Sequence, residues 1–282
     1  MSELIYCINN LSAKDIIKSV AKTANGTPFY LQTSGLGGFV AEYQAVYDVF
    51  SVKPTAAIAA AQNTMVAGLV DGGYWAGLDW FYDAGSYAEA DVLINWVNPG
   101  TYTLTKNGVI TWVQNTGVTS NGTTGYYATG WNPSVGGFNY IQNDAMVGIY
   151  VRNNAQDDGY IFGINAAHDI FFRPRTSADA ITAKINDTSS LGGASVDSRG
   201  LWAVTRNGTA KIVYRNGASF SPAVIASTGM PDGDFAILSL NGGASFCTNQ
   251  VSIIYAGKVS TMNQPAIYTL IQAYMTAKGV QV

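Results

Sequence analysis

Asn-Gly pairs at both ends of one short segment constrain this fold more than any other feature. The pairs are Asn207-Gly208 and Asn216-Gly217, and the residues 209–215 between them alternate apolar and polar side chains. Asn-Gly between alternating segments favours a type I′ hairpin turn, because both central residues of that turn take a positive φ. The sequence therefore predicts antiparallel strands joined by tight turns in this part of the chain.

The same pattern extends over residues 101–258, where Gly, Asn and Asp separate short alternating segments. The expected strands are 101–105, 109–113, 126–129, 145–151, 160–164, 170–173, 181–185, 201–206, 209–215, 235–240 and 251–258. Many short strands at this spacing indicate an antiparallel sandwich or barrel. A final helix is expected after Asn263, with Pro265 in its first turn and Gly279 at its end.

The chain before residue 98 is expected to be helical. Ser12 is a candidate cap for a first helix, and Pro54 fits the first turn of a second one. A short third helix is expected over 75–82, because Trp75, Leu78 and then Phe81 or Tyr82 fall on one helical face.

These patterns divide the chain into two regions. Residues 1–97 form a helical attachment and oligomerisation region, in which 35–38 (Gly-Leu-Gly-Gly) is a flexible joint. Residues 98–282 form the sandwich domain with its C-terminal helix.

Charged residues make up only 12% of the chain, about half of the usual ~25%. The net charge is −3 and the 15 basic residues are scattered, which argues against a nucleic-acid partner. The longest apolar stretch, 56–69, is interrupted by Gln62 and Asn63, so no membrane span and no membrane partner are expected. The N-terminus has no basic segment followed by an apolar one, so we also expect no signal peptide.

The groups that perform catalysis are few. His168 is the single histidine, no Gly-x-Ser-x-Gly elbow is present, and all three glutamates precede residue 98. Asp157-Asp158 and Asp232-Gly233-Asp234 are close acidic pairs, but both lie in Gly-bearing segments where Asp commonly bonds to backbone amides. Calcium binding and catalysis are the alternatives for these two pairs, and two turn carboxylates do not by themselves establish a calcium site. We expect no enzyme activity, no metal and no cofactor. Cys7 and Cys247 are expected to be small buried hydrophobes.

One aromatic segment is a candidate for sugar binding. Tyr126, Tyr127, Trp131 and Asn132 lie close together in 125–133, and aromatic rings stack on sugars while amides bind hydroxyls. The alternative is that these aromatics belong to the core or to a subunit interface, which is the commoner role of such residues. Trp112 and Trp202, in alternating strands, are expected in the core.

Two stretches resemble segments of bacteriophage virion proteins. They are residues 93–102, with Asn98-Pro99-Gly100, and residues 125–144. The later part, with Ser198-Arg199-Gly200 and 213–217 (Val-Tyr-Arg-Asn-Gly), resembles the concanavalin A-like sandwich of phage tail and fibre proteins. The resemblance implies a two-sheet jelly roll and a virion role, and it carries over no catalytic residues.

We therefore expect a structural virion protein of a bacteriophage, assembled in the host cytoplasm and displayed as capsid decoration, head fibre or tail-fibre component. Its expected partners are other virion proteins, further copies of itself in a trimer, and host-surface glycans. The alternatives are a polysaccharide-degrading enzyme, a glycoside hydrolase or lyase, and a cellular carbohydrate-binding module.

Overall fold

The computed structural model describes residues 21–22, 28–29 and 38–282. The chain splits into two units, Met1–Phe39 and Val40–Val282. In the first, the two-residue strands β1 (Ala21–Lys22) and β2 (Pro28–Phe29) pair antiparallel. The helix expected after Ser12, Cys7 and most of the joint at 35–38 lie outside the described residues.

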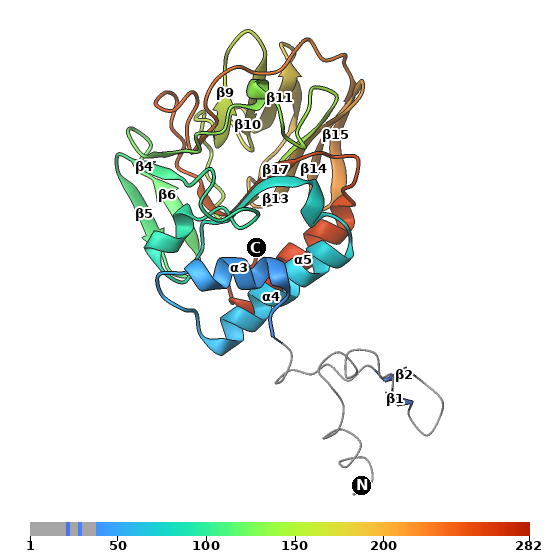
Figure 1. Cartoon of the computed structure of the whole chain (residues 1–282). Coiled ribbons are helices and arrows are strands. Elements are labelled where there is room, and N and C mark those ends of the chain that lie inside the picture. The colour runs from blue at the N-terminus through green and yellow to red at the C-terminus, as the bar shows by residue number, and fades with distance from the viewer. Residues whose placement is uncertain (1–20, 23–27, 30–37) are drawn as a thin grey trace, which may run out of the picture. The chain divides into compact units, whose positions relative to one another are not determined.

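The second unit contains two antiparallel sheets (Figure 1). The eight-stranded sheet consists, in spatial order, of β15 (Ala218–Val224), β14 (Ala210–Arg215), β13 (Gly200–Asn207), β8 (Asp144–Val151), β17 (Gln250–Gly257), β6 (Gly117–Ser120) and β5 (Ile110–Val113), with β3 (Leu78–Asp83) also paired to β17. The seven-stranded sheet consists of β12 (Leu191–Ala194), β11 (Ala180–Asp187), β10 (Asp169–Arg173), β9 (Phe162–Ile164), β16 (Ala236–Ile237), β7 (Tyr126–Ala128) and β4 (Thr105–Asn107). This arrangement confirms the predicted antiparallel sandwich.

The two Asn-Gly pairs form different turns. Arg215 pairs with Ala218, and both residues between them have positive φ, 50° at Asn216 and 78° at Gly217, as a type I′ turn requires. At the other end of β14, Asn207 itself pairs with Ala210. The central residues are therefore Gly208 and Thr209, and only Gly208 (58°) has positive φ, the pattern of a type II′ turn. The expectation of a type I′ turn at Asn207-Gly208 was wrong by one residue of register.

Inward-facing side chains of both sheets form one apolar core. Trp202 is fully buried, and Trp112 is half-buried against the core, as expected for these two residues. Cys247 is buried as a free thiol. Alternation along each strand places every second side chain in this core and leaves the others on an outer face.

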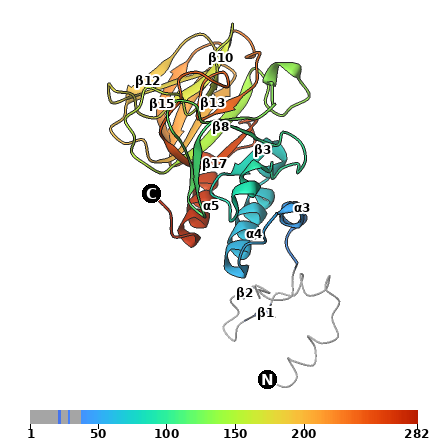
Figure 2. The ribbon, with the colours of Figure 1, turned by 90° about the vertical axis from the view of Figure 1, so that its left-hand side faces the viewer.

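Three α-helices accompany the sheets: α3 (Ala41–Val49), α4 (Ala56–Asp71) and α5 (Gln264–Ala277). The Asn263 side chain accepts a hydrogen bond from Ala266 N at 3.2 Å, so the predicted cap of α5 is confirmed. Helix α5 covers the outer face of the eight-stranded sheet, where Tyr150 donates to Gln272 at 2.8 Å. Figure 2 shows α4 and α5 next to each other beneath the strands.

The third helix expected over 75–82 was wrong. Trp75–Gly77 forms a single 3-10 turn, η1, and the chain then continues as β3, with Trp80 opposite Ala256 and Tyr82 opposite Ile254. Both faces of β3 are apolar because Trp80 and Tyr82 enter the core while Phe81 packs on Tyr255 outside it. A strand buried on both faces has no alternation to distinguish it from a helix.

The domain boundary at 97/98 also needs correction. Strand β3 belongs to the sandwich although it precedes residue 98, and the compact unit begins at Val40. The segment that follows β3 adds two further 3-10 turns, η2 (Glu89–Leu93) and η3 (Pro133–Val135), around the first strands of the sandwich.

A buried ionic cluster connects the two sheets. Asp187, at the end of β11, forms ion pairs with Arg206 of β13 and with Lys211 of β14, whose Nζ lies 3.0 Å from both carboxylate oxygens. All three side chains are at most 1% exposed. Backbone carbonyls of Ile185 and Ile225 accept further hydrogen bonds from Arg206, at 2.8 and 2.6 Å. Burial lowers the pKa of Lys211, and its contact with Asp187 opposes that shift.

We predict that Asp187→Asn destabilises the protein by about 3–5 kcal/mol, because it leaves two buried cations without their counter-ion. The measurement is urea unfolding of the full chain. Lys106→Gln is the control, since it removes the exposed pair between Lys106 and Glu89 (2.6 Å) and should change stability by less than ~1 kcal/mol. Equal losses in the two variants would contradict the role given to Asp187.

Candidate functional site

A groove of about 430 Å³ opens on the outer face of the seven-stranded sheet. It is lined by Tyr126, Ala128, Ile164, Asn165, Asp232, Gly233, Asp234, Phe235, Ala236, Asn241 and Gly242. The residues come from strands β7, β16 and β9 and from the loops that follow β9 and flank β16. The helices cover the opposite side of the sandwich, on the outer face of the other sheet.

Small residues form the floor of the groove. Ala128 and Ala236 are directly paired across β7 and β16, and both point outward because Tyr127 and Ile237, their neighbours along the strands, enter the core. Cross-strand neighbours on one face lie about 5 Å apart, so two methyl groups leave space where larger side chains would fill it. The small side chains of this pair therefore leave room for the groove above them.

One wall is the turn at 232–234. Asp232 Oδ1 accepts hydrogen bonds from Asn132 Nδ2 and Ser134 Oγ, both at 2.8 Å. These bonds, that from Asn132 first, lower the pKa of the Asp232 carboxyl below its ordinary value. Within the described part of the chain, Asp232 Oδ2 and the Asp234 carboxylate have no hydrogen-bond partner. This wall thus presents carboxylate oxygens to the groove, and one carboxylate is held in place.

The opposite wall combines an aromatic ring with a tight turn. The half-buried Tyr126 ring packs on Phe246, with 6.2 Å between centroids. The turn contains Asn241 and Gly242, with φ of 50° and 62°. Asn241 bonds to the Asn165 backbone twice, accepting from N at 2.6 Å and donating to O at 2.9 Å. These bonds connect two rim loops that are far apart in the sequence.

The structure separates the four predicted sugar-binding residues. Tyr126 lines the groove, and Asn132 contacts it through Asp232. Tyr127 (1% exposed) and Trp131 (0%) are core residues, so their assignment to a glycan platform was wrong and the core alternative holds for both. Strand alternation places Tyr127 on the inner face, and Trp131 is enclosed by aromatic rings that include Trp80 at 5.6 Å.

Sequence reasoning missed Asn165, Asp234 and Asn241. The turn of Asp232 and Asp234 was recognised as a turn, but nothing in the sequence indicated that it meets β7 and the Asn241-Gly242 turn across the sheet. Asn241-Gly242 is itself a turn signal, and it locates a loop without indicating which strand that loop covers.

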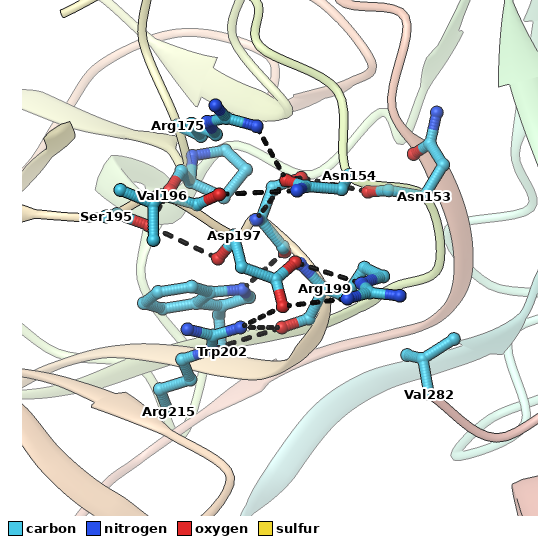
Figure 3. Close-up of polar contacts among 12 residues, drawn as sticks. Asn153, Asn154, Arg175, Ser195, Val196, Asp197, Arg199, Trp202, Arg215 and Val282 are labelled. Carbon is cyan, nitrogen blue, oxygen red and sulfur yellow. Dashed lines mark hydrogen bonds and ion pairs between the residues drawn. The ribbon is translucent and has the colours of Figure 1, made fainter. Parts of the chain in front are cut away.

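A second polar cluster surrounds the turn at 195–199 (Figure 3). Asp197 accepts from Arg199 Nε at 3.0 Å and pairs with Arg215 Nη2 at 3.2 Å. Arg215 also donates to the Arg199 carbonyl at 2.8 Å and lies over the Trp202 ring. The two sequence motifs 198–200 and 213–217 therefore lie next to each other. Because these charges are paired within the cluster, we assign it a structural role.

The other candidate groups have structural partners. His168 Nδ1 lies 3.0 Å from Thr228 Oγ1, and Asp157 accepts from Gly159 N at 2.6 Å, as in the turn expected there. The described residues contain no cluster of three or more His, Cys, Asp or Glu side chains suited to a metal ion. Among the same residues, no helix has both the length and the apolar character needed to cross a bilayer.

The comparisons with known proteins show the fold alone. No protein-family model and no curated protein matches the chain. Among solved structures, it is similar to the binding domain of botulinum neurotoxin serotype D (TM-score 0.51, 10% identity, 69% of this chain and 51% of that one). A mutant of HCR/D has a TM-score of 0.52 at 8% identity, over 69% of this chain and 52% of that one. Trypanosoma rangeli sialidase in complex with sialic acid has a TM-score of 0.48 at 12% identity, over 73% and 38%. The chain spans about half the length of the first two structures.

We predict that Trp131→Ala destabilises the protein by about 3–5 kcal/mol, because it empties a fully buried site. Tyr126→Ala, in the groove wall, should cost only about 1 kcal/mol. Chemical denaturation of both variants separates the core residue from the groove residue. A larger loss at Tyr126 than at Trp131 would contradict this assignment.

Proposed function

We propose that this protein is a non-catalytic glycan-binding sandwich displayed on a bacteriophage particle, and that the groove holds the glycan. The observation that carries the proposal is an open groove in which an aromatic ring faces carboxylate and amide groups on a rigid sheet. Ligand sites combine apolar surface with a few fixed polar groups in this way. Recognition by loops on a rigid scaffold is also a common arrangement.

The electrostatics of Asp232 argue against this residue as the acid of a glycosidase. A glycosidase needs one carboxyl group that stays protonated to act as the acid, and its pKa must therefore be raised. Hydrogen bonds from Asn132 and Ser134 shift the pKa of Asp232 in the opposite direction. The presence of two carboxylates in one groove keeps a glycoside hydrolase as the second candidate, and a cleavage assay distinguishes the two.

The proposed display on a virion is supported by the sequence resemblance and by the placement of the groove. Helix α5 occupies the outer face of the eight-stranded sheet through Tyr150–Gln272 (2.8 Å) and Gln264–Met146 (3.1 Å). The groove opens on the other side of the sandwich. In this proposal the helical side attaches to other virion proteins and further copies of the chain, and the groove side faces the host surface.

We predict that Ala128→Trp abolishes glycan binding, because an indole at the floor fills the groove. Tyr126→Ala should weaken binding at least tenfold through loss of the ring contact. A glycan array followed by calorimetry on the best ligand measures both effects. Ala194→Trp is the matched control, since Ala194 is exposed at the edge strand β12 of the same sheet, and it should bind like the unchanged protein.

Reducing-sugar release from the bound glycan should stay at background. Release above background that is lost in Asp232→Asn or Asp234→Asn would favour the hydrolase instead. Unchanged binding by Ala128→Trp would remove the groove from the proposal.

We also predict a trimer present in purified particles. Light scattering should give about three times the chain mass of 29.9 kDa, and mass spectrometry of particles should detect the protein. Hundreds of copies per particle would indicate capsid decoration and a handful would indicate the tail. A mass near that of one chain, or absence from purified particles, would contradict this part of the proposal.

A further inference from the structure

The groove is lined by carboxylates without a compensating cation. Asp232 and Asp234 are its charged lining residues, and its lining contains no Lys, Arg or His. Among the described residues near the groove, the cations are directed elsewhere. Lys184 lies on β11, two strands away from β9, and is paired with Asp169 at 2.7 Å.

The cation on the other side of the groove points away from it. Lys106 lies on β4, beside β7, and is paired across the strands with Tyr127, whose side chain enters the core. Side chains of directly paired residues leave the same face of a sheet, so Lys106 projects away from the groove. It forms an ion pair with Glu89 at 2.6 Å. On the neighbouring strand β10 at the other edge of the groove, Arg173 lies over the Tyr160 ring, 3.7 Å from its centroid. The cations of the two neighbouring strands therefore have other partners, and neither lines the groove.

The acidic wall is also fixed before any ligand arrives. Asn132 and Ser134 hold Asp232 Oδ1, so the carboxylate cannot turn away from an approaching anion without losing two hydrogen bonds of 2.8 Å. The same bonds keep this group ionised to lower pH than an ordinary aspartate. Ionised carboxylates accept strong hydrogen bonds from hydroxyl groups. An anionic group of a ligand in the groove would be repelled by the same carboxylates.

From this charge distribution we infer that the groove selects uncharged glycans and rejects those that carry a carboxylate, such as sialylated or uronic-acid sugars. The inference rests on the proposed function and adds the ligand class. Hydroxyl groups of an uncharged sugar donate to Asp232 Oδ2 and Asp234, and the Tyr126 ring covers one sugar face. In this arrangement Asn132 is a positioning residue that orients Asp232.

The test compares N-acetyllactosamine with its sialylated form, and a neutral hexose oligomer with its uronic-acid counterpart, by calorimetry at neutral pH. We expect at least tenfold weaker binding of the anionic member of each pair. Added salt should narrow the difference, because the repulsion is screened. Asp234→Asn should also narrow the difference in affinity between neutral and anionic glycans. Asn132→Ala should weaken the binding of neutral glycans, while its free energy of unfolding stays within about 1 kcal/mol of that of the unchanged protein.

Asp71→Asn is the charge-matched control, because it removes an exposed carboxylate at the end of α4 and should leave the ratio unchanged. Anionic glycans that bind as tightly as neutral ones, or more tightly, overturn this inference while the proposed function stands. The inference is also overturned if Asp71→Asn reduces the ratio of neutral to anionic affinity as much as Asp234→Asn does. The net charge of the protein would then be the cause of the selectivity. If no glycan of either kind binds, both the proposed function and this inference fall.

Discussion

A single buried carboxylate joins the two sheets of the sandwich. Apolar packing attracts the sheets without fixing their relative position, because the hydrophobic effect has no direction. Asp187 supplies direction, since it receives hydrogen bonds from Arg206 and Lys211 across the interface. Two cations facing one carboxylate would leave a buried positive charge, and backbone carbonyls such as that of Ile185 take up the remaining donors. The floor of the groove belongs to the seven-stranded sheet, and the ionic cluster attaches that sheet to the other one. The groove therefore depends on this arrangement.

Each sheet uses its outer face differently. The eight-stranded sheet is covered by helix α5 on that side, and β3 extends it next to β17. Among the described residues, no α-helix covers that face of the seven-stranded sheet, and loops cover part of it instead. The segment around Leu240 lies over Gly163, where a side chain would collide with Phe171 and Leu240. The exposed part of the sheet that remains beside this loop is the groove.

Local signals predicted much of the fold. The turn at Asn216-Gly217 and the cap at Asn263 depend on residues within one turn of the chain, so they are visible in the sequence. The strand containing Trp80 was missed because burial on both faces removes its alternation. The site was harder to predict, because Tyr126, Asn165 and Asp232 meet only through strand order. Aromatic content alone did not distinguish Tyr126 from the buried Trp131.

The paired alanines of the floor have a consequence for how such a protein diversifies. Ala128 is half-buried and lies outside the core, so a larger residue there alters the surface without repacking the interior, whereas Ala236 is only 1% exposed. The rim residues lie on loops, which accept substitution more readily than strands. Depth and chemistry of the groove can therefore change independently of each other and of folding. A scaffold of this kind can therefore acquire a groove of different depth or charge through single substitutions that leave its fold intact.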